Sequence, residues 1–195
     1  TSMVFPSLSR IGGEAGMGLI KAWAEAGHYV GNHTSQHRSL SSPDLTLDEF
    51  IADAVEGDVA FRSVPQFVPM LRFPFLKEGN TIEKRDGIQQ WMKLNGYTPA
   101  AVSIDTSDWY YNQLFISFTD AGLTNKAAQV QRAYVAHLIE RANYYDGLAK
   151  QVLGRSPKHA MLLHTSAINA ACVRAIVTVF RARGWKFVSP ISAFS

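Results

Sequence analysis

Two histidines four residues apart, His33 and His37, are the strongest local sign of chemistry in this sequence. If the segment between them is helical, the two imidazoles lie about one turn apart and face the same way. Neutral histidine nitrogens bind zinc at about 2.0–2.1 Å, so the pair could supply two ligands. The same spacing also suits two polar side chains on a surface loop, and the residues alone leave both interpretations open.

Two other segments carry groups that suit acid–base catalysis. One runs from Asp105 to Trp109 and includes a second carboxylate, Asp108, and the other is Leu162-Leu163-His164. A carboxylate beside a histidine fixes the imidazole tautomer and raises the imidazole pKa, which makes it a general acid near neutral pH. The alternative interpretations are a helix N-cap for Asp105 and a core histidine for His164.

Apolar periodicity predicts the elements that must position these groups. Strands are expected at 3–5, 29–30, 70–75, 100–104, 161–163 and 185–188. Helices are expected over 18–27, 82–94, 124–152 and 168–183, with a further helix that starts in a capping box at Thr46–Glu49. This alternation is typical of α/β proteins with a mainly parallel sheet, in which chemistry collects where strands end.

The sequence also predicts where individual side chains of these elements lie. The helix after Thr46 is expected to bury Phe50, Ile51, Val55 and Val59, and Thr124 is expected to cap the longest helix. Cys172 is expected to be a small core residue. Four aromatic residues are expected on a loop, as a sugar-binding lip or as ordinary packing: Trp109, Tyr110, Tyr111 and Phe115.

The composition indicates a globular protein. The chain has 195 residues, of which 47% are hydrophobic and 18% charged, and its net charge is +3. These values exclude a disordered or collagen-like chain and predict one domain over residues 1–195. The basic residues are scattered, which argues against nucleic-acid binding, and no apolar stretch approaches the roughly 18 residues that span a bilayer. The start at Thr1 is expected to reflect processing or a chosen boundary.

Four segments, taken in order, resemble the motifs of a known family. They are Gly27–His37, Arg72-Phe73-Pro74-Phe75, Asp105–Trp109 and Leu162–His164. In this order and spacing they resemble four of the five motifs of the polysaccharide deacetylases, the NodB-homology domains of carbohydrate esterase family 4. The resemblance covers residues from about 15 to 190. It implies a distorted (β/α) barrel that removes N- or O-acetyl groups from a chitin-, peptidoglycan- or xylan-type glycan, with one divalent metal ion. Zinc is the expected metal, with cobalt or nickel as alternatives.

The resemblance also implies roles for the residues of the first two motifs. His33 and His37 would be metal ligands, and Arg72 would orient the catalytic carboxylate. The backbone N–H of Phe75 would help to hold the oxyanion of the tetrahedral intermediate. The metal would lower the pKa of a water molecule and polarise the acetyl carbonyl.

The last two motifs receive the remaining roles. His164 would be the general acid that protonates the leaving amine or alcohol, and Asp108 would tune it. Trp109 and Leu162 would form the walls of the small pocket that takes the acetyl methyl group.

The sequence departs from the family at its first motif. That motif carries an Asp-Asp pair that supplies the catalytic base and the third metal ligand, and no such pair occurs here. The domain is therefore expected to be N-terminally incomplete, with the first β/α unit missing. The alternatives are a glycan-binding pseudoenzyme and a hydrolase of small non-peptide amides. The partner is expected to be an acetylated glycan, and the resemblance alone suggests an exported, periplasmic or cell-envelope protein.

Overall fold

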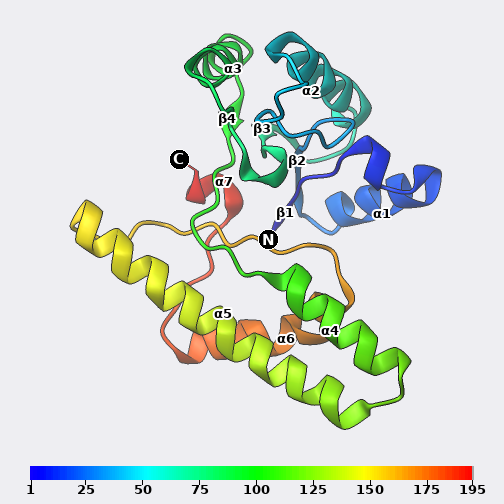
Figure 1. Ribbon diagram of the computed structural model, residues 1–195, viewed down its shortest axis with the longest axis vertical. Coiled ribbons are helices and arrows are strands. Elements are labelled where there is room, and N and C mark those ends of the chain that lie inside the picture. Colours follow the sequence, from blue (N-terminus) through cyan, green and yellow to red (C-terminus); the bar gives the residue numbers. More distant parts are fainter. Residues whose placement is uncertain (195) are drawn as a thin grey trace. The chain divides into compact units, whose positions relative to one another are not determined.

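A computed structural model describes residues 1–194, which form two compact units (Figure 1). The first comprises residues 1–101 together with the C-terminal residues from 189 onward, and we call it the sheet unit. The second comprises residues 102–188, and we call it the helical unit.

The sheet unit is built on four parallel strands in the order β1-β2-β3-β4. They span Met3–Val4, Tyr29–Asn32, Phe67–Leu71 and Thr98–Pro99. The helices α1 (Gly13–Glu25), α2 (Leu47–Phe61) and α3 (Ile82–Leu94) connect successive strands, as a parallel sheet requires. Two 3₁₀ turns, η1 (Leu8–Arg10) and η2 (Pro74–Leu76), and the short helix α7 (Pro190–Ala193) complete this unit. The predicted α/β class with a parallel sheet is confirmed.

Local sequence signals fix the ends of these helices. The capping box at Thr46 is present, with the Thr46 hydroxyl accepting from the Glu49 N–H and the Glu49 carboxylate accepting from the Thr46 N–H. Thr81 caps α3 in the same way through the Lys84 N–H, without the reciprocal carboxylate bond. Gly27 follows α1 with φ +85°, the left-handed conformation that glycine adopts without strain.

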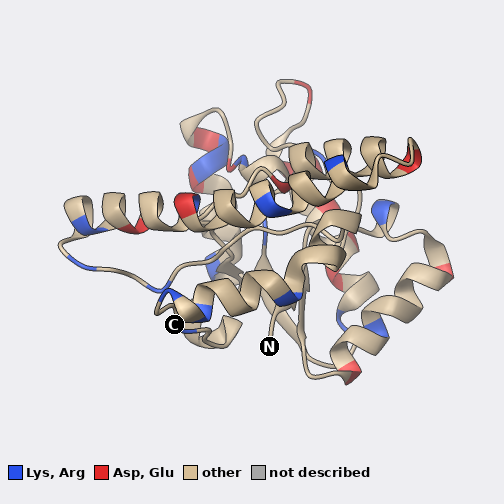
Figure 2. Cartoon of the chain, turned by 90° about the horizontal axis from the view of Figure 1, so that it is seen from below, with Lys and Arg blue, Asp and Glu red and all other residues tan. Residues whose placement is uncertain are grey.

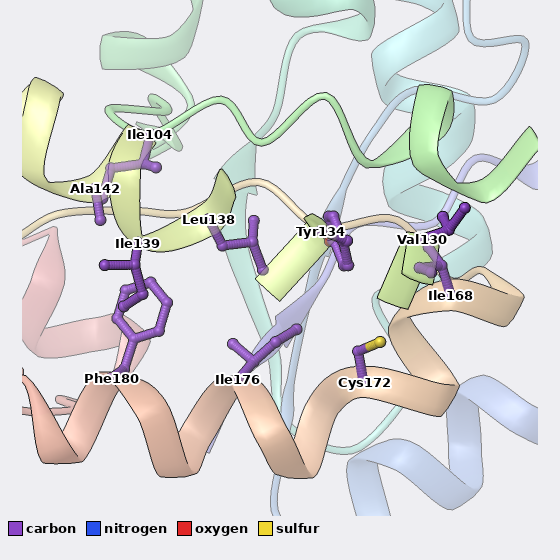
Figure 3. Close-up of a cluster of buried hydrophobic side chains, with 10 residues drawn as sticks. All are labelled: Ile104, Val130, Tyr134, Leu138, Ile139, Ala142, Ile168, Cys172, Ile176 and Phe180. Atoms are coloured by element: carbon purple, nitrogen blue, oxygen red, sulfur yellow. The ribbon is translucent and has the colours of Figure 1, made fainter. Parts of the chain in front are cut away.

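The helical unit consists of three helices that pack on one another: α4 (Asp108–Asp120), α5 (Thr124–Leu153) and α6 (Ala167–Ala182). A single parallel bridge, Ile104 to Met161, joins the segments that lead into α4 and α6. In the core of this unit, Cys172, Ile176 and Phe180 of α6 point toward a row of α5 side chains (Figure 3). Cys172 is 2% exposed, so its predicted core position is confirmed.

Several expected elements differ in the structure. The third strand is Phe67–Leu71 and not 70–75, because the chain turns into η2 at Pro74. No strand forms over 100–104 or 185–188, and residues 161–163 contribute only the bridge at Met161. The aromatic cluster lies on α4 and not on a loop.

Two expectations about side chains on helices were also wrong. Val55 and Val59 are 45% and 74% exposed, because the inner face of α2 carries Asp53 and Asp58, which are held by hydrogen bonds. Thr124 does not cap α5: it is the first helical residue, and Leu123 precedes it without a side-chain cap.

Basic and acidic residues are both spread along the helices (Figure 2). In the sequence these residues do not form a long run of one sign, and the net charge is +3. Within residues 1–194, no helix combines the length and the apolar character needed to cross a membrane.

Candidate active site

The two predicted metal ligands lie together where β2 ends. The rings of His33 and His37 are 4.7 Å apart between centroids and meet edge to face. The His33 Nδ1 lies 2.6 Å from the carbonyl oxygen of Arg72. Because a carbonyl can only accept, this Nδ1 carries the proton, and Nε2 holds the lone pair in the neutral ring. Such a backbone hydrogen bond is the usual way in which a metal-binding histidine is oriented.

The segment between the two histidines is not helical, contrary to the condition under which they were expected to face the same way. Thr34 and His37 both have left-handed backbones, with φ of 64° and 55°. The His37 N–H donates to Thr34 Oγ1 at 3.1 Å, which closes a tight turn. The rings therefore approach each other through the curvature of this turn and not through helical spacing.

Buried polar groups hold this turn against α2. The Gln36 N–H donates to Asp53 Oδ1 at 2.7 Å, and the Ser35 N–H donates to the Asp53 carbonyl at 3.0 Å. The Thr34 N–H donates to Asn32 Oδ1 at 2.8 Å. Gly57 lets the helix come this close, because a Cβ there would lie 2.7 Å from Asn32 Oδ1. Sequence reasoning missed these residues, although an acidic residue on the buried stripe of a helix was a usable signal.

Arg72 is a buried cation with neutral partners. It is 8% exposed, its Nε donates to the Ala100 carbonyl at 2.6 Å, and its guanidinium lies 4.3 Å from the centroid of the Phe5 ring. Burial lowers the pKa of Arg72 to about 10, so the side chain stays charged at neutral pH. Among residues 1–194, no carboxylate forms an ion pair with it.

Phe75 occupies a strained turn beside the histidines. Its φ is +57°, which is uncommon for a residue with a bulky side chain, and strain of this kind clusters at functional sites. The Phe75 ring is 59% exposed and lies 4.8 Å from the ring of His37 between centroids. Its backbone is therefore held next to the histidine pair, where the oxyanion role was expected.

The donor set of the sheet unit fits part of a zinc site. Two imidazoles fill two of the three protein positions that a catalytic zinc needs. Among the described residues 1–194, no group of three or more His, Cys, Asp or Glu side chains could hold a metal ion. If a metal ion binds this unit, His33 and His37 are the side chains placed to supply two of its ligands.

The helical unit brings together Asp108 and His164. Asp108 is the first residue of α4 and is 1% exposed, whereas the His164 side chain is 56% exposed. The imidazole Nδ1 lies 2.7 Å from Asp108 Oδ1, and the His164 backbone N–H donates to Asp108 Oδ2 at 2.6 Å. A buried carboxylate thus presents an accessible imidazole to solvent.

Hydrogen bonds keep the Asp108 carboxylate ionised. Burial by itself would raise the pKa of Asp108, but the bonds from the side chain and backbone of His164, together with one from Asn169, outweigh burial and lower this pKa. An ionised carboxylate can only accept, so the neutral His164 ring carries its proton on Nδ1. Nε2 of the neutral ring then carries the lone pair and lies on the side of the ring away from the Asp108 carboxylate.

The last two predicted site residues lie near this pair in sequence and structure. Trp109 follows Asp108 on α4 and is 59% exposed. Leu162 is half-buried, and its carbonyl accepts from Thr106 Oγ1 at 2.7 Å. Both belong to the helical unit, together with Asp108 and His164, whereas His33, His37, Arg72 and Phe75 belong to the sheet unit.

No protein-family model matches this sequence, and no curated protein sequence matches it either. Solved structures do match. A CE4 family pseudoenzyme from Bacillus anthracis aligns with a TM-score of 0.68 and 13% identity, over 100% of this chain and 56% of that chain. A mutant of that pseudoenzyme is described as having restored enzymatic activity. This chain therefore spans a little over half the length of the pseudoenzyme.

Two further structures carry the names of enzymes. A family 4 carbohydrate esterase from Streptomyces lividans, in complex with acetate, aligns with a TM-score of 0.60 and 15% identity, over 98% of this chain and 80% of that one. The catalytic domain of a peptidoglycan N-acetylglucosamine deacetylase from Eubacterium rectale aligns with a TM-score of 0.63 and 15% identity, over 96% and 74%. The chain has the fold of the family 4 carbohydrate esterases. Of the barrel expected for this esterase fold, the described residues contain a four-stranded parallel sheet, and the missing first β/α unit stays a prediction.

Proposed function

We propose that this protein is a metal-dependent deacetylase of an N- or O-acetylated glycan. The observation that carries the proposal is the pair formed by buried Asp108 and exposed His164, a geometry suited to protonating a leaving amine or alcohol. The adjacent histidines His33 and His37 support the metal dependence. The exposed Trp109 supports a sugar substrate, because sugar rings stack on aromatic faces.

Each residue then has a defined task in the reaction. A divalent metal held by His33 and His37 would supply Lewis-acid polarisation of the acetyl carbonyl and of water. The Phe75 N–H would donate to the developing oxyanion. In its imidazolium form, stabilised by Asp108, His164 would deliver its Nε2 proton to the leaving nitrogen or oxygen and become the neutral Nδ1–H ring. Trp109 and Leu162 would enclose the acetyl methyl group.

Arg72 bears on the source of the catalytic base. A buried guanidinium without a carboxylate partner carries a desolvation cost that a nearby carboxylate would offset. We propose that the base and the third metal ligand come from residues outside this sequence. Formate added to the protein is then expected to raise the rate of acetate release to a plateau in the wild type, and less so in Arg72→Lys. An equal response of both proteins would contradict this source of the base.

The first test is zinc binding by this chain. We expect bound zinc to be lost in the double variant His33→Ala/His37→Ala and retained in His28→Ala, which removes a histidine of the same unit that instead accepts a hydrogen bond from the Ser2 N–H. Isothermal titration calorimetry with folded samples measures both. Equal zinc affinity in the wild type and the double variant would refute the ligand assignment.

The second test concerns the general acid. His164→Ala is expected to slow acetate release from N-acetylglucosamine oligomers by about 10²–10⁴ while leaving zinc binding unchanged. Wild-type turnover in this variant would eliminate the assigned role. If the wild type binds zinc and oligomers but releases no acetate, even with formate, the glycan-binding pseudoenzyme is the better description. Release of acetate from small amides alone would favour the third alternative.

A further inference from the structure

Asn169 connects the Asp108 carboxylate to the backbone of His164, the proposed general acid. It is the third residue of α6 and is 8% exposed. Its Nδ2 donates to Asp108 Oδ2 at 2.7 Å and to the His164 carbonyl at 2.9 Å. One amide group therefore spans both partners of the catalytic pair.

Tyr134 determines which way this amide faces. It lies on α5, is fully buried, and its hydroxyl donates to Asn169 Oδ1 at 2.5 Å. Burial is the main cause that raises the pKa of Tyr134, so the phenol keeps its proton throughout the neutral range. Because only the amide oxygen can accept this hydrogen bond, the NH₂ group is turned toward Asp108 and His164.

The result is a carboxylate whose two oxygens are both occupied. Asp108 Oδ1 accepts from the His164 ring, and Oδ2 accepts from the His164 backbone and from Asn169. Besides His164, the titratable side chains of this cluster are Tyr134 on α5 and Cys172 on α6, and burial raises the pKa of each, so both stay neutral. Asp108 is the one anion of this cluster and cannot rotate without breaking several bonds.

We propose that Asn169, oriented by Tyr134, is a positioning residue that fixes the Asp108 carboxylate and thereby holds His164 in the Nδ1–H tautomer. The inference rests on the proposed function, because the tautomer matters only if Nε2 serves the reaction. Without the amide, Oδ2 loses a donor, the carboxylate gains rotational freedom, and the imidazole is no longer held in one orientation.

The test measures the tautomer directly and does not need activity. Nitrogen-15 NMR of the neutral His164 ring is expected to show mainly the Nδ1–H form in the wild type, with a clear rise of the Nε2–H form in Asn169→Leu and in Tyr134→Phe. Tyr134→Phe removes one hydroxyl and little volume, so it keeps the test valid if Asn169→Leu does not fold. Tyr145→Phe, on the same helix and packed against the same core, is the matched control and is expected to match the wild type. A folded Tyr134→Phe protein with the wild-type tautomer would overturn the inference.

Kinetics separate this inference from the proposed function. In a sample that releases acetate, both variants are expected to lower kcat by about 10- to 100-fold, with KM and zinc affinity unchanged, as is usual when the residue behind a catalytic group is removed. An unchanged kcat in Asn169→Leu would overturn the positioning role. If even the wild type releases no acetate, the proposed function fails, while the tautomer measurement still decides whether Asn169 orients His164.

Discussion

Asp53 shows how one side chain can hold the turn that carries the proposed metal ligand His37 without contributing a ligand atom itself. Its side chain is fully covered. Its carbonyl accepts a hydrogen bond from the Ser35 N–H, and its Oδ1 accepts one from the Gln36 N–H. These bonds hold the turn that carries His37. Arg38 lies 3.7 Å from the other carboxylate oxygen and balances its charge.

Removing this carboxylate is expected to weaken zinc binding. Asp53→Ala leaves the Gln36 N–H without its acceptor and loosens the turn, so zinc affinity should fall by about 10- to 100-fold. Asp53→Asn keeps an acceptor oxygen and should retain most of the affinity. Calorimetric zinc titration of both variants checks the prediction, and equal affinity in Asp53→Ala and the wild type would contradict it.

At the scale of single residues, the sequence names candidate site residues where their types form a recognisable motif. His33 and His37 are named by residue type and by position after a strand-like run, whereas Asp108 and His164, which are 56 residues apart, are paired only through the resemblance to the family motifs. The supporting residues were not predicted, because their partners are distant in the sequence: Asn169 is 61 residues from Asp108 and 35 from Tyr134. A pattern of neighbouring residues carries no record of such contacts.

At the scale of elements, the capping box that begins α2 is a sequence signal that the structure confirms. Thr46→Ala removes the hydroxyl, which accepts from the Glu49 N–H and donates to the Glu49 carboxylate, and is expected to lower the free energy of unfolding by about 1–2 kcal/mol. Thr81→Ala, the matched control, removes a cap without the reciprocal carboxylate bond and should cost less. Urea denaturation of both variants measures the difference. A larger loss in Thr81→Ala would contradict the role given to Glu49.

Elements were predicted well where periodicity and caps agree, and poorly where polar groups replace apolar ones on the inner face. The helix over 82–94 was predicted with the observed ends, Ile82 and Leu94. The inner face of α2 was misassigned, because Asp53 and Asp58 occupy positions at which an apolar residue was expected. The helix α4 was missed, because its aromatic residues do not form a simple apolar stripe.

At the scale of the whole molecule, two carboxylates make the fold sensitive to acid. The Lys150 ammonium, with the hydroxyl of Ser156 and the ring of His159, lowers the pKa of Asp146 to about 2 from an ordinary value of 3.8. The pKa of Asp108 is also lowered. A lowered carboxyl pKa contributes stability above its ordinary value, and this stability is lost as the pH falls toward the folded-state value.

The midpoint of thermal unfolding is therefore expected to be steady near neutral pH and to fall between about pH 4 and pH 2. Asp146→Asn should have a lower midpoint at pH 7 and a flatter decline toward pH 2, since it has no proton to take up. Circular dichroism melts across this range measure both curves. Parallel curves for the two proteins would show that Asp146 does not contribute to the acid sensitivity.

The division of the chain into units has a consequence for synthesis on the ribosome. Residues 102–188 form a continuous segment of three mutually packed helices. The sheet unit is made of two separate segments, residues 1–101 and the residues from 189 onward, with the helical unit between them in the sequence. Local helical contacts form quickly, so the helical unit can fold as soon as its last helix leaves the exit tunnel. The sheet unit, although its strands are made first, obtains α7 only after the helical unit has been made. A nascent chain halted before residue 189 would thus contain the complete helical unit but only the first of the two segments that form the sheet unit.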